Sequence, residues 1–201
     1  MWCVVHVGEG REAGMEAFMR KLFTGMARTR CFHLVQHRVM RFHGTLWDVP
    51  RKYFPGYVFI ETDDSREVEA ILKKTGKKLP LGDGEHLFVL NREEEAFFKG
   101  ISDEKGEIGL SVARVCLDAG SGRRKVEYLS GPLASLAHRV VSVDYHKRFA
   151  EIDMRFSGGT GALKLDFYYD GEEISRGMAG AQNRSGEPTG ARKKNRDMVL
   201  R

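Results

Sequence analysis

The segment RKYFPGYVFI, residues 51–60, places a proline and a glycine side by side within a run of aromatic and β-branched residues. Such a run is typical of a β-strand, but proline cannot donate a hydrogen bond to a sheet and glycine weakens a strand interior. We therefore predict that Phe54-Pro55-Gly56 precedes a strand over residues 57–61. Aromatic rings fall on both faces of this segment, so periodicity leaves open whether they fill the core or form a docking surface.

The sequence on either side predicts alternating strands and helices. Apolar residues at spacings of three and four indicate amphipathic helices, and β-branched runs bounded by turn residues indicate strands. The predicted helices cover residues 11–27, 66–74 and 92–101, and the predicted strands cover residues 2–7, 31–42, 47–49, 57–61 and 87–90. This order predicts an α+β fold with helices against an antiparallel sheet.

A change in composition divides the chain. Residues 102–122 are rich in glycine, serine and acids, whereas residues 125–169 carry four or five short strand patterns separated by glycine turns, which predicts a small barrel. The last residues contain few apolar side chains and seven Lys/Arg against four Asp/Glu, which predicts disorder. The predicted organisation is a first domain over 1–101, a linker over 102–122, a second domain over 123–170 and a basic tail over 171–201.

Composition argues against several classes of protein. No apolar run approaches the roughly 20 residues that span a bilayer, and the first residues lack the features of an export signal, so we expect a cytoplasmic protein that begins with a strand. Cys3, Cys31 and Cys116 are scattered and form no CxxC pair, which predicts buried, reduced thiols.

Catalytic and metal-binding patterns are weak. His33 and His37 stand four residues apart near Cys31, but on a strand such residues diverge along the element and no second cluster accompanies them. The chain has no GxSxG motif and no P-loop, and the glycines at 158–161 join two predicted strands. We therefore expect no metal, no cofactor and no enzymatic activity.

Charge is distributed unevenly along the chain, whose formal net charge is +5. Residues 11–52 carry nine Lys/Arg against three Asp/Glu, whereas residues 61–95 carry six against ten. This pattern favours a protein that faces nucleic acid on one side, with scattered solvated charge as the alternative.

Three motifs together resemble the NusG-type transcription elongation factors. They are Trp2-x-Val4-Val5 followed by Gly10-x-Glu12, then Phe54-Pro55-Gly56-Tyr57-Val58-Phe59, then Gly131-Pro132-Leu133. The resemblance covers residues 1–169. It implies an N-terminal NGN domain, an antiparallel sheet with flanking helices, linked to a C-terminal KOW domain, an SH3-like β-barrel.

Within that family, residues 143–150 and the loop at 80–84 are most similar to the specialised paralogues called LoaP, which are processive antiterminators recruited by an RNA hairpin in the nascent leader. Two features depart from the family pattern. A glycine usual in KOW motifs is replaced near His138, which puts a standard KOW loop geometry in doubt, and the tail is longer than the family needs.

The resemblance also implies three sets of binding residues. RNA polymerase, through its clamp helices, is expected to contact Trp2, Phe54, Pro55 and Tyr57. Upstream or non-template DNA is expected to face the basic residues Arg38, Arg41, His43, Arg51 and Lys52 through phosphate charge. A nascent RNA hairpin is expected to contact Arg123, Arg124, Lys125, His138, Arg139, His146, Lys147 and Arg148. The alternatives are core rings, a solvated hairpin and a polar turn, respectively.

The predicted function is therefore processive antitermination by a monomer that binds RNA polymerase, suppresses pausing and termination, and is recruited by nascent RNA. One alternative is a general elongation factor whose KOW domain docks a ribosomal or termination protein. A second alternative is a ribosomal-type RNA-binding protein that never contacts polymerase.

Overall fold

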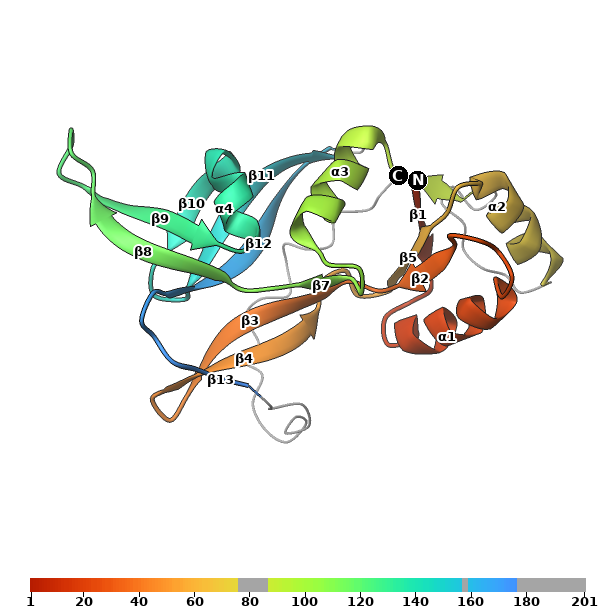
Figure 1. The fold of residues 1–201 in the computed structure, drawn as a ribbon, viewed down its shortest axis with the longest axis horizontal. Helices are drawn as coiled ribbons and strands as arrows, with labels where there is room; N and C mark the ends of the chain where they lie inside the picture. Colours follow the sequence, from red (N-terminus) through yellow and green to blue (C-terminus); the bar gives the residue numbers. More distant parts are fainter. Residues whose placement is uncertain (76–86, 157–158, 177–201) are drawn as a thin grey trace. The chain divides into compact units, whose positions relative to one another are not determined.

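The computed structural model describes residues 1–75, 87–156 and 159–176 and has a mixed α+β fold, as predicted (Figure 1). The chain forms two compact units. The first contains residues 1–36 and 52–108, and the second contains residues 37–51 and the chain from residue 109 onward. Residues 37–51 belong to the range predicted as the first domain, yet they are part of the second unit.

The first unit is built on a four-stranded antiparallel sheet with the order β2-β5-β1-β6. Its strands are β1 (Trp2–His6), β2 (Arg30–Phe32), β5 (Tyr57–Glu61) and β6 (Phe88–Val89). Its helices are α1 (Glu12–Leu22), α2 (Ser65–Lys74) and α3 (Arg92–Ile101). In this unit the start of β3 (Val35–Phe42) also pairs in parallel with β7 (Glu107–Ile108).

Alternation along β1 and β5 divides the core of the first unit into two layers. Val5 and Ile60 point toward α1 and α2, where they pack in one apolar cluster with Met19 and Leu72. The opposite face carries aromatic rings, and Phe98 of α3 packs against them. The cluster also contains the thiols of Cys3 and Cys31, whose pKa values burial raises to about 11 and about 12.

Local sequence explains where the helices begin and end. Asp64 accepts the backbone N–H groups of Arg66 and Glu67 at 2.8 and 3.2 Å and starts α2. Asn91 starts α3 in the same way and forms a capping box with Glu94. Helix α1 ends at Leu22, five residues before its predicted limit at residue 27. Gly25 has a φ of 94°, which is incompatible with a right-handed α-helix, so the helix does not extend to residue 27.

The second unit contains a hairpin and a five-stranded sheet. The hairpin consists of the rest of β3 and β4 (Thr45–Lys52), and β13 (Ile174–Arg176) pairs in parallel with β4. The sheet has the order β10-β11-β12-β8-β9. Its strands are β8 (Ser111–Leu117), β9 (Arg124–Ser130), β10 (Val140–Asp144), β11 (Phe149–Phe156) and β12 (Gly159–Tyr169). The helical segments α4 (Pro132–Leu136) and η1 (Ala137–Arg139) join β9 to β10.

Three predictions of local structure need correction. The predicted linker contains β8, which the pattern did not indicate because Val115 and Leu117 are 41% and 71% exposed and only pairing with β9 holds that half of the strand. The turn at residues 130–132 continues into α4, where Ser111 Oγ accepts the Leu133 N–H at 3.0 Å. The predicted tail contributes β13. The remaining tail from residue 177, the loop at 80–84 and Gly158 lie outside the described residues.

Candidate functional site

The Phe54-Pro55-Gly56 turn has a backbone that requires glycine. Gly56 has a φ of 89°, and a Cβ at this position would lie 3.2 Å from both the Glu9 nitrogen and His6 Nε2. The Gly56 carbonyl also accepts the N–H of Val7 at 2.7 Å. The turn therefore packs directly on the backbone that leads from β1 into α1.

A buried carboxylate anchors this turn. Glu12 Oε1 accepts the N–H of Gly56 at 2.7 Å, and Glu12 Oε2 lies 2.5 Å from the ammonium of Lys52. Burial alone would raise the pKa of Glu12, but the bonds from Lys52 and Gly56 outweigh it and lower the pKa to about 2. Lys52, predicted to face DNA, is held in an ion pair within the first unit, with its side chain 41% exposed.

Aromatic rings line this turn and are partly open to solvent. The Phe54 ring packs 4.9 Å from Tyr53 and 5.6 Å from Phe98 between centroids, and the Tyr57 ring packs 4.9 Å from His6. Phe54 and Tyr57 are half-buried, whereas Pro55 is exposed. We call Phe54, Pro55 and Tyr57 the aromatic step.

Trp2 does not belong to the aromatic step, although it was predicted to contact the polymerase. It is only 1% exposed, and its ring packs edge-on against Phe32 at 4.8 Å. Lys99 Nζ lies 5.9 Å from the Trp2 ring centroid and is held there by Glu61 at 3.0 Å. The alternative of a core ring therefore holds for Trp2, because α3 covers its face of the sheet.

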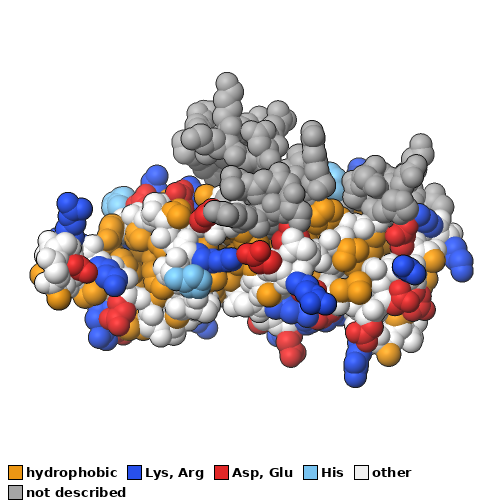
Figure 2. Space-filling model, turned by 90° about the horizontal axis from the view of Figure 1, so that it is seen from above, with side chains coloured by type: hydrophobic (Ala, Val, Ile, Leu, Met, Phe, Trp, Pro, Cys, Tyr) orange, Lys and Arg blue, Asp and Glu red, His pale blue; other side chains and the backbone are white. Residues whose placement is uncertain are grey.

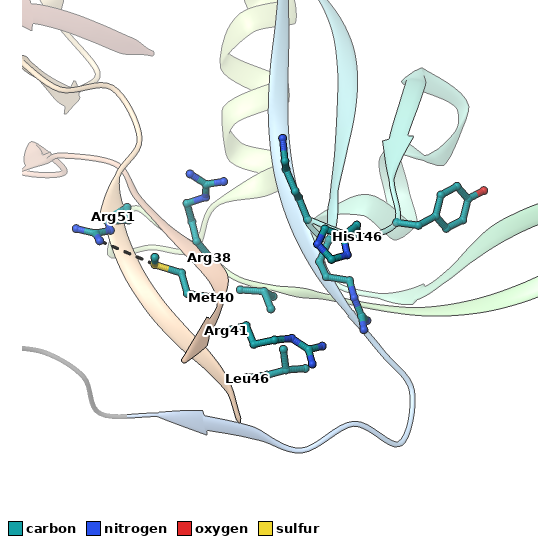
Figure 3. A pocket seen from close by; sticks show the side chains of 10 residues that line it. Arg38, Met40, Arg41, Leu46, Arg51 and His146 are labelled. Atoms are coloured by element: carbon teal, nitrogen blue, oxygen red, sulfur yellow. Dashed lines mark hydrogen bonds between the residues drawn. The ribbon is translucent and has the colours of Figure 1, made fainter. Parts of the chain in front are cut away.

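The second unit contains a pocket of about 490 Å³ between its hairpin and the turn that follows β10 (Figure 3). Both predicted nucleic-acid sets contribute to it. The lining residues are Arg38, Val39, Met40, Arg41, Leu46, Arg51, Tyr145, His146, Lys147 and Arg148. We call this the basic pocket. It joins three residues predicted to face DNA with three predicted to bind RNA.

Asp166 of β12 fixes one wall of the basic pocket. Both of its carboxylate oxygens lie 3.4 Å from Arg38 Nε, and one accepts the N–H of Val39 at 3.1 Å. Burial raises the pKa of Asp166 to about 6, although the nearby Arg38 charge acts in the opposite direction. The carboxylate thus ties the beginning of the hairpin to the five-stranded sheet.

Arg148 forms another part of the wall and is already engaged. Its guanidinium makes two bonds of 2.7 Å to Glu172 and lies 3.8 Å from the Tyr169 ring centroid. Burial opposes the shift, but the Arg148 charge lowers the pKa of Glu172 below its usual value. Arg148 therefore shapes the pocket, with its side chain 12% exposed.

The turn from Tyr145 to Arg148 presents two polar side chains outward. Asp144 accepts the N–H groups of His146 and Lys147 at 3.1 and 2.8 Å, and these bonds lower its pKa. His146 is exposed, and the side chain of Lys147 is 71% exposed with its ammonium 4.0 Å from Asp144. The turn is thus fixed at its backbone while its basic groups face solvent.

The other predicted basic residues lie outside the lining of the basic pocket. His43 is exposed at the hairpin turn with a φ of 49°. The exposed side chains of Arg123, Arg124 and Lys125 lie at the start of β9, and His138 and Arg139 lie in η1. On the face shown in Figure 2, basic and acidic side chains are interspersed.

The two histidines with metal-like spacing have separate acidic partners. His33 Nδ1 lies 2.6 Å from Glu16 in the first unit, and His37 Nδ1 lies 2.6 Å from Asp48 in the second. In the part of the chain that the structure describes, no group of three or more His, Cys, Asp or Glu side chains is placed to hold a metal ion. Over the same residues, no helix combines the length and the apolar character needed to cross a membrane.

Comparison with known proteins adds no assignment. A scan against protein-family models finds no model that matches this chain, and a search of curated proteins finds no match.

Sequence reasoning missed the residues that organise both sites. Glu12 was part of a sequence motif but was assigned no function, and Asp166 was not singled out. A local signal existed for Asp166, whose neighbours on β12 are the apolar Leu165 and Phe167, but none existed for Glu12, which follows Arg11. A buried acid of this kind needs a partner, and the partners come from residues 40 or more positions away.

Proposed function

We propose that this protein is a NusG-type transcription factor that binds RNA polymerase through the aromatic step and binds nascent RNA through the second unit. The observation that carries the proposal is the construction of the aromatic step. Its glycine is locked by Glu12, its proline is exposed, and its two rings are half-buried on a packed support. Rigid aromatic side chains of this kind supply large contact areas at a low entropic cost.

The aromatic step suits a helical partner. Paired helices present ridges of apolar side chains, and half-buried aromatic rings can pack against such ridges. Because the Glu12–Gly56 bond fixes the turn before binding, little conformational freedom is lost when the partner docks. On the resemblance to NusG-type factors, the proposed partner is the pair of clamp helices of RNA polymerase.

The second unit supplies the nucleic-acid contacts in this proposal. Its basic pocket contains five Lys/Arg side chains, and the LoaP-like turn at residues 143–150 forms one of its walls. Contacts of lysine and arginine to phosphates release counterions, so we expect RNA binding that weakens steeply with salt. A factor held on polymerase by one unit and on nascent RNA by the other suppresses pausing and termination without catalysing a reaction and without a cofactor or metal.

One observation favours the alternative of a general elongation factor. Val115, Leu117 and Leu129 on the β8–β9 ribbon are 41%, 71% and 39% exposed. Exposed apolar side chains on paired strands are typical of a protein-binding surface. In this alternative the second unit docks a ribosomal or termination protein through the ribbon in place of RNA.

The proposal is tested by binding of the purified chain to the RNA polymerase of its source organism. We expect Tyr57→Ala and Phe54→Ala each to weaken binding at least tenfold while circular dichroism shows a folded protein. Val89→Ala is the matched control, because Val89 is a 44% exposed apolar residue of the same unit. Wild-type affinity in both step variants would overturn the docking assignment.

A further inference from the structure

We propose that the basic pocket binds one nucleotide unit, so that the β3–β4 hairpin and the Tyr145–Arg148 turn contact the same nucleoside phosphate. The inference deepens the proposed function and rests on it only in assigning that nucleotide to an RNA strand. It replaces the expectation that the hairpin faces DNA while the turn faces RNA.

The size and composition of the pocket fit this ligand class. Its volume of about 490 Å³ lies within the range of roughly 300–1,000 Å³ that is usual for small-ligand sites. Val39, Met40 and Leu46 give it an apolar part, and Tyr145 adds an aromatic ring. A nucleotide has the same division, because its base is flat and largely apolar on its faces while its phosphate is charged.

The charges of the pocket favour a phosphate. Five Lys/Arg side chains line it, whereas three carboxylates are ion-paired with lining residues, namely Asp166, Glu172 and Asp144. Among the residues that the structure describes, the basic side chains of the lining thus outnumber the carboxylates that pair with them. Arg41 is exposed and extends from β3 toward the turn, and His146 faces the same space from the other side (Figure 3).

The carboxylate side chains of Asp166, Glu172 and Asp144 hold the basic residues of the pocket in a defined geometry. Asp166 orients Arg38 through its Nε, and the side chain of Arg38 remains 44% exposed. Glu172 fixes Arg148 through two bonds, and Asp144 fixes the backbone of His146 and Lys147. Arginine and lysine groups positioned before binding lose little entropy when they bind a phosphate. The pocket is thus preorganised on both walls.

The two walls come from segments that lie about 100 residues apart, and this separation makes the inference testable. A ligand that occupies the pocket must perturb both walls, whereas nonspecific attraction to the exposed turn perturbs only residues near Lys147. We therefore expect a nuclear magnetic resonance titration of the full chain with adenosine and guanosine monophosphates to shift the amides of Val39, Met40, His146 and Lys147 together. Shifts confined to the turn would contradict a shared site.

Affinity for RNA gives the second readout. A fluorescently labelled RNA stem-loop is titrated by anisotropy against Arg41→Gln, Lys147→Gln and the control Lys105→Gln, which removes an exposed charge of the first unit that belongs to no predicted binding set. We expect each pocket variant to weaken binding about tenfold and to lower the slope of log affinity against log salt by about 1. The control is expected to change affinity less than twofold.

The outcomes separate the sources of the nucleotide. Shifts with free monophosphates, together with competition against the stem-loop, identify a site that accepts the free nucleotide. Binding of the stem-loop alone, still weakened by Arg41→Gln, identifies a nucleotide within a strand. If Arg41→Gln and Lys105→Gln behave alike, or if neither probe binds, the inference is wrong. Polymerase binding is measured on the same variants, in which the aromatic step is unchanged. This measurement tells whether the proposed function fails together with the nucleotide site or survives without it.

Discussion

Glu12 and Gly56 are 44 positions apart in the chain, and a carboxylate oxygen of Glu12 accepts the backbone N–H of Gly56 at 2.7 Å. This bond joins the first turn of α1 to the turn that precedes β5. It explains why a glycine interrupts an aromatic segment, since a Cβ at this position would lie 3.2 Å from the Glu9 nitrogen. The aromatic step owes its position to this carboxylate.

Removing the charge of Glu12 is expected to destabilise the first unit in a pH-dependent manner. Its pKa falls from 4.5 to about 2 on folding, so the carboxylate contributes stability above pH 4.5 and loses it as the pH falls toward 2. The shift corresponds to about 3 kcal/mol at neutral pH. We expect Glu12→Gln, which keeps an acceptor for Gly56, to lower the free energy of unfolding by about 2 kcal/mol at pH 7.

Urea unfolding monitored by Trp2 fluorescence measures this effect. The chain has two tryptophans, so a Trp47→Phe background makes the signal specific for the first unit. Glu9→Gln is the control, because Glu9 is exposed on the neighbouring turn. Equal stability of Glu12→Gln and Glu9→Gln at pH 7 would show that the ion pair does not anchor the step.

Asp166 is expected to show the opposite dependence on pH. Its pKa rises from 3.8 to about 6 on folding, so the buried charge costs stability above pH 6 and the cost disappears as the pH falls toward 4. Relative to Asp166→Asn, the wild-type protein should gain about 2 kcal/mol in the free energy of unfolding between pH 7 and pH 4. Urea unfolding monitored by Trp47 in a Trp2→Phe background measures the difference. Asp153→Asn, at an exposed position of β11, should show no such gain.

Gly131 and Gly122 form a matched pair that tests the entry into α4. Both have positive φ values, 80° and 64°, but a Cβ on Gly131 would lie 2.6 Å from the Leu110 carbonyl, whereas one on Gly122 would meet nothing within 4 Å. We expect Gly131→Ala to destabilise the second unit by about 3 kcal/mol and Gly122→Ala by about 1 kcal/mol. Equal losses in urea unfolding would mean that the contact with Leu110 relaxes freely.

Substitutions of Trp2 and Tyr57 are expected to distinguish a residue that stabilises the core from one that binds the partner. Trp2 is 1% exposed among aromatic rings, so Trp2→Ala is expected to cost about 3–5 kcal/mol of stability. Tyr57 is half-buried against His6, so Tyr57→Ala should cost about 1 kcal/mol and act mainly on polymerase binding. Thermal unfolding and a polymerase-binding assay on the same samples distinguish the two. A Trp2→Ala protein of wild-type stability would contradict the buried position.

Local sequence patterns identified the elements that their own residues specify. The bounds of β5 and α3 agree with the prediction because alternation and the Asn91 cap are local features. Strand β8 was missed because half of it is exposed on both faces and depends on pairing with β9. Strand β13 was missed because Ile174–Arg176 pair with a strand more than 120 residues earlier in the chain.

The candidate sites, like β8 and β13, depend on contacts between segments that are distant in the sequence. Aromatic residues around Pro55 could be recognised from composition, but the burial of Trp2 depends on α3 and on the placement of Lys99. The basic residues of the pocket were found individually, yet nothing local indicates that Arg41 and His146 share one space. That relationship depends on Asp166, a charged residue on a buried strand whose partner lies 127 positions away.

The most direct test of the account is transcription in vitro past a terminator with purified RNA polymerase from the source organism. The template encodes a leader hairpin selected beforehand for its binding to the purified chain. We predict that the wild-type protein raises readthrough at least threefold, that Tyr57→Ala abolishes the gain, and that Val89→Ala retains it. Readthrough that is unchanged by the wild-type protein, at concentrations that saturate polymerase binding, would contradict the proposed function.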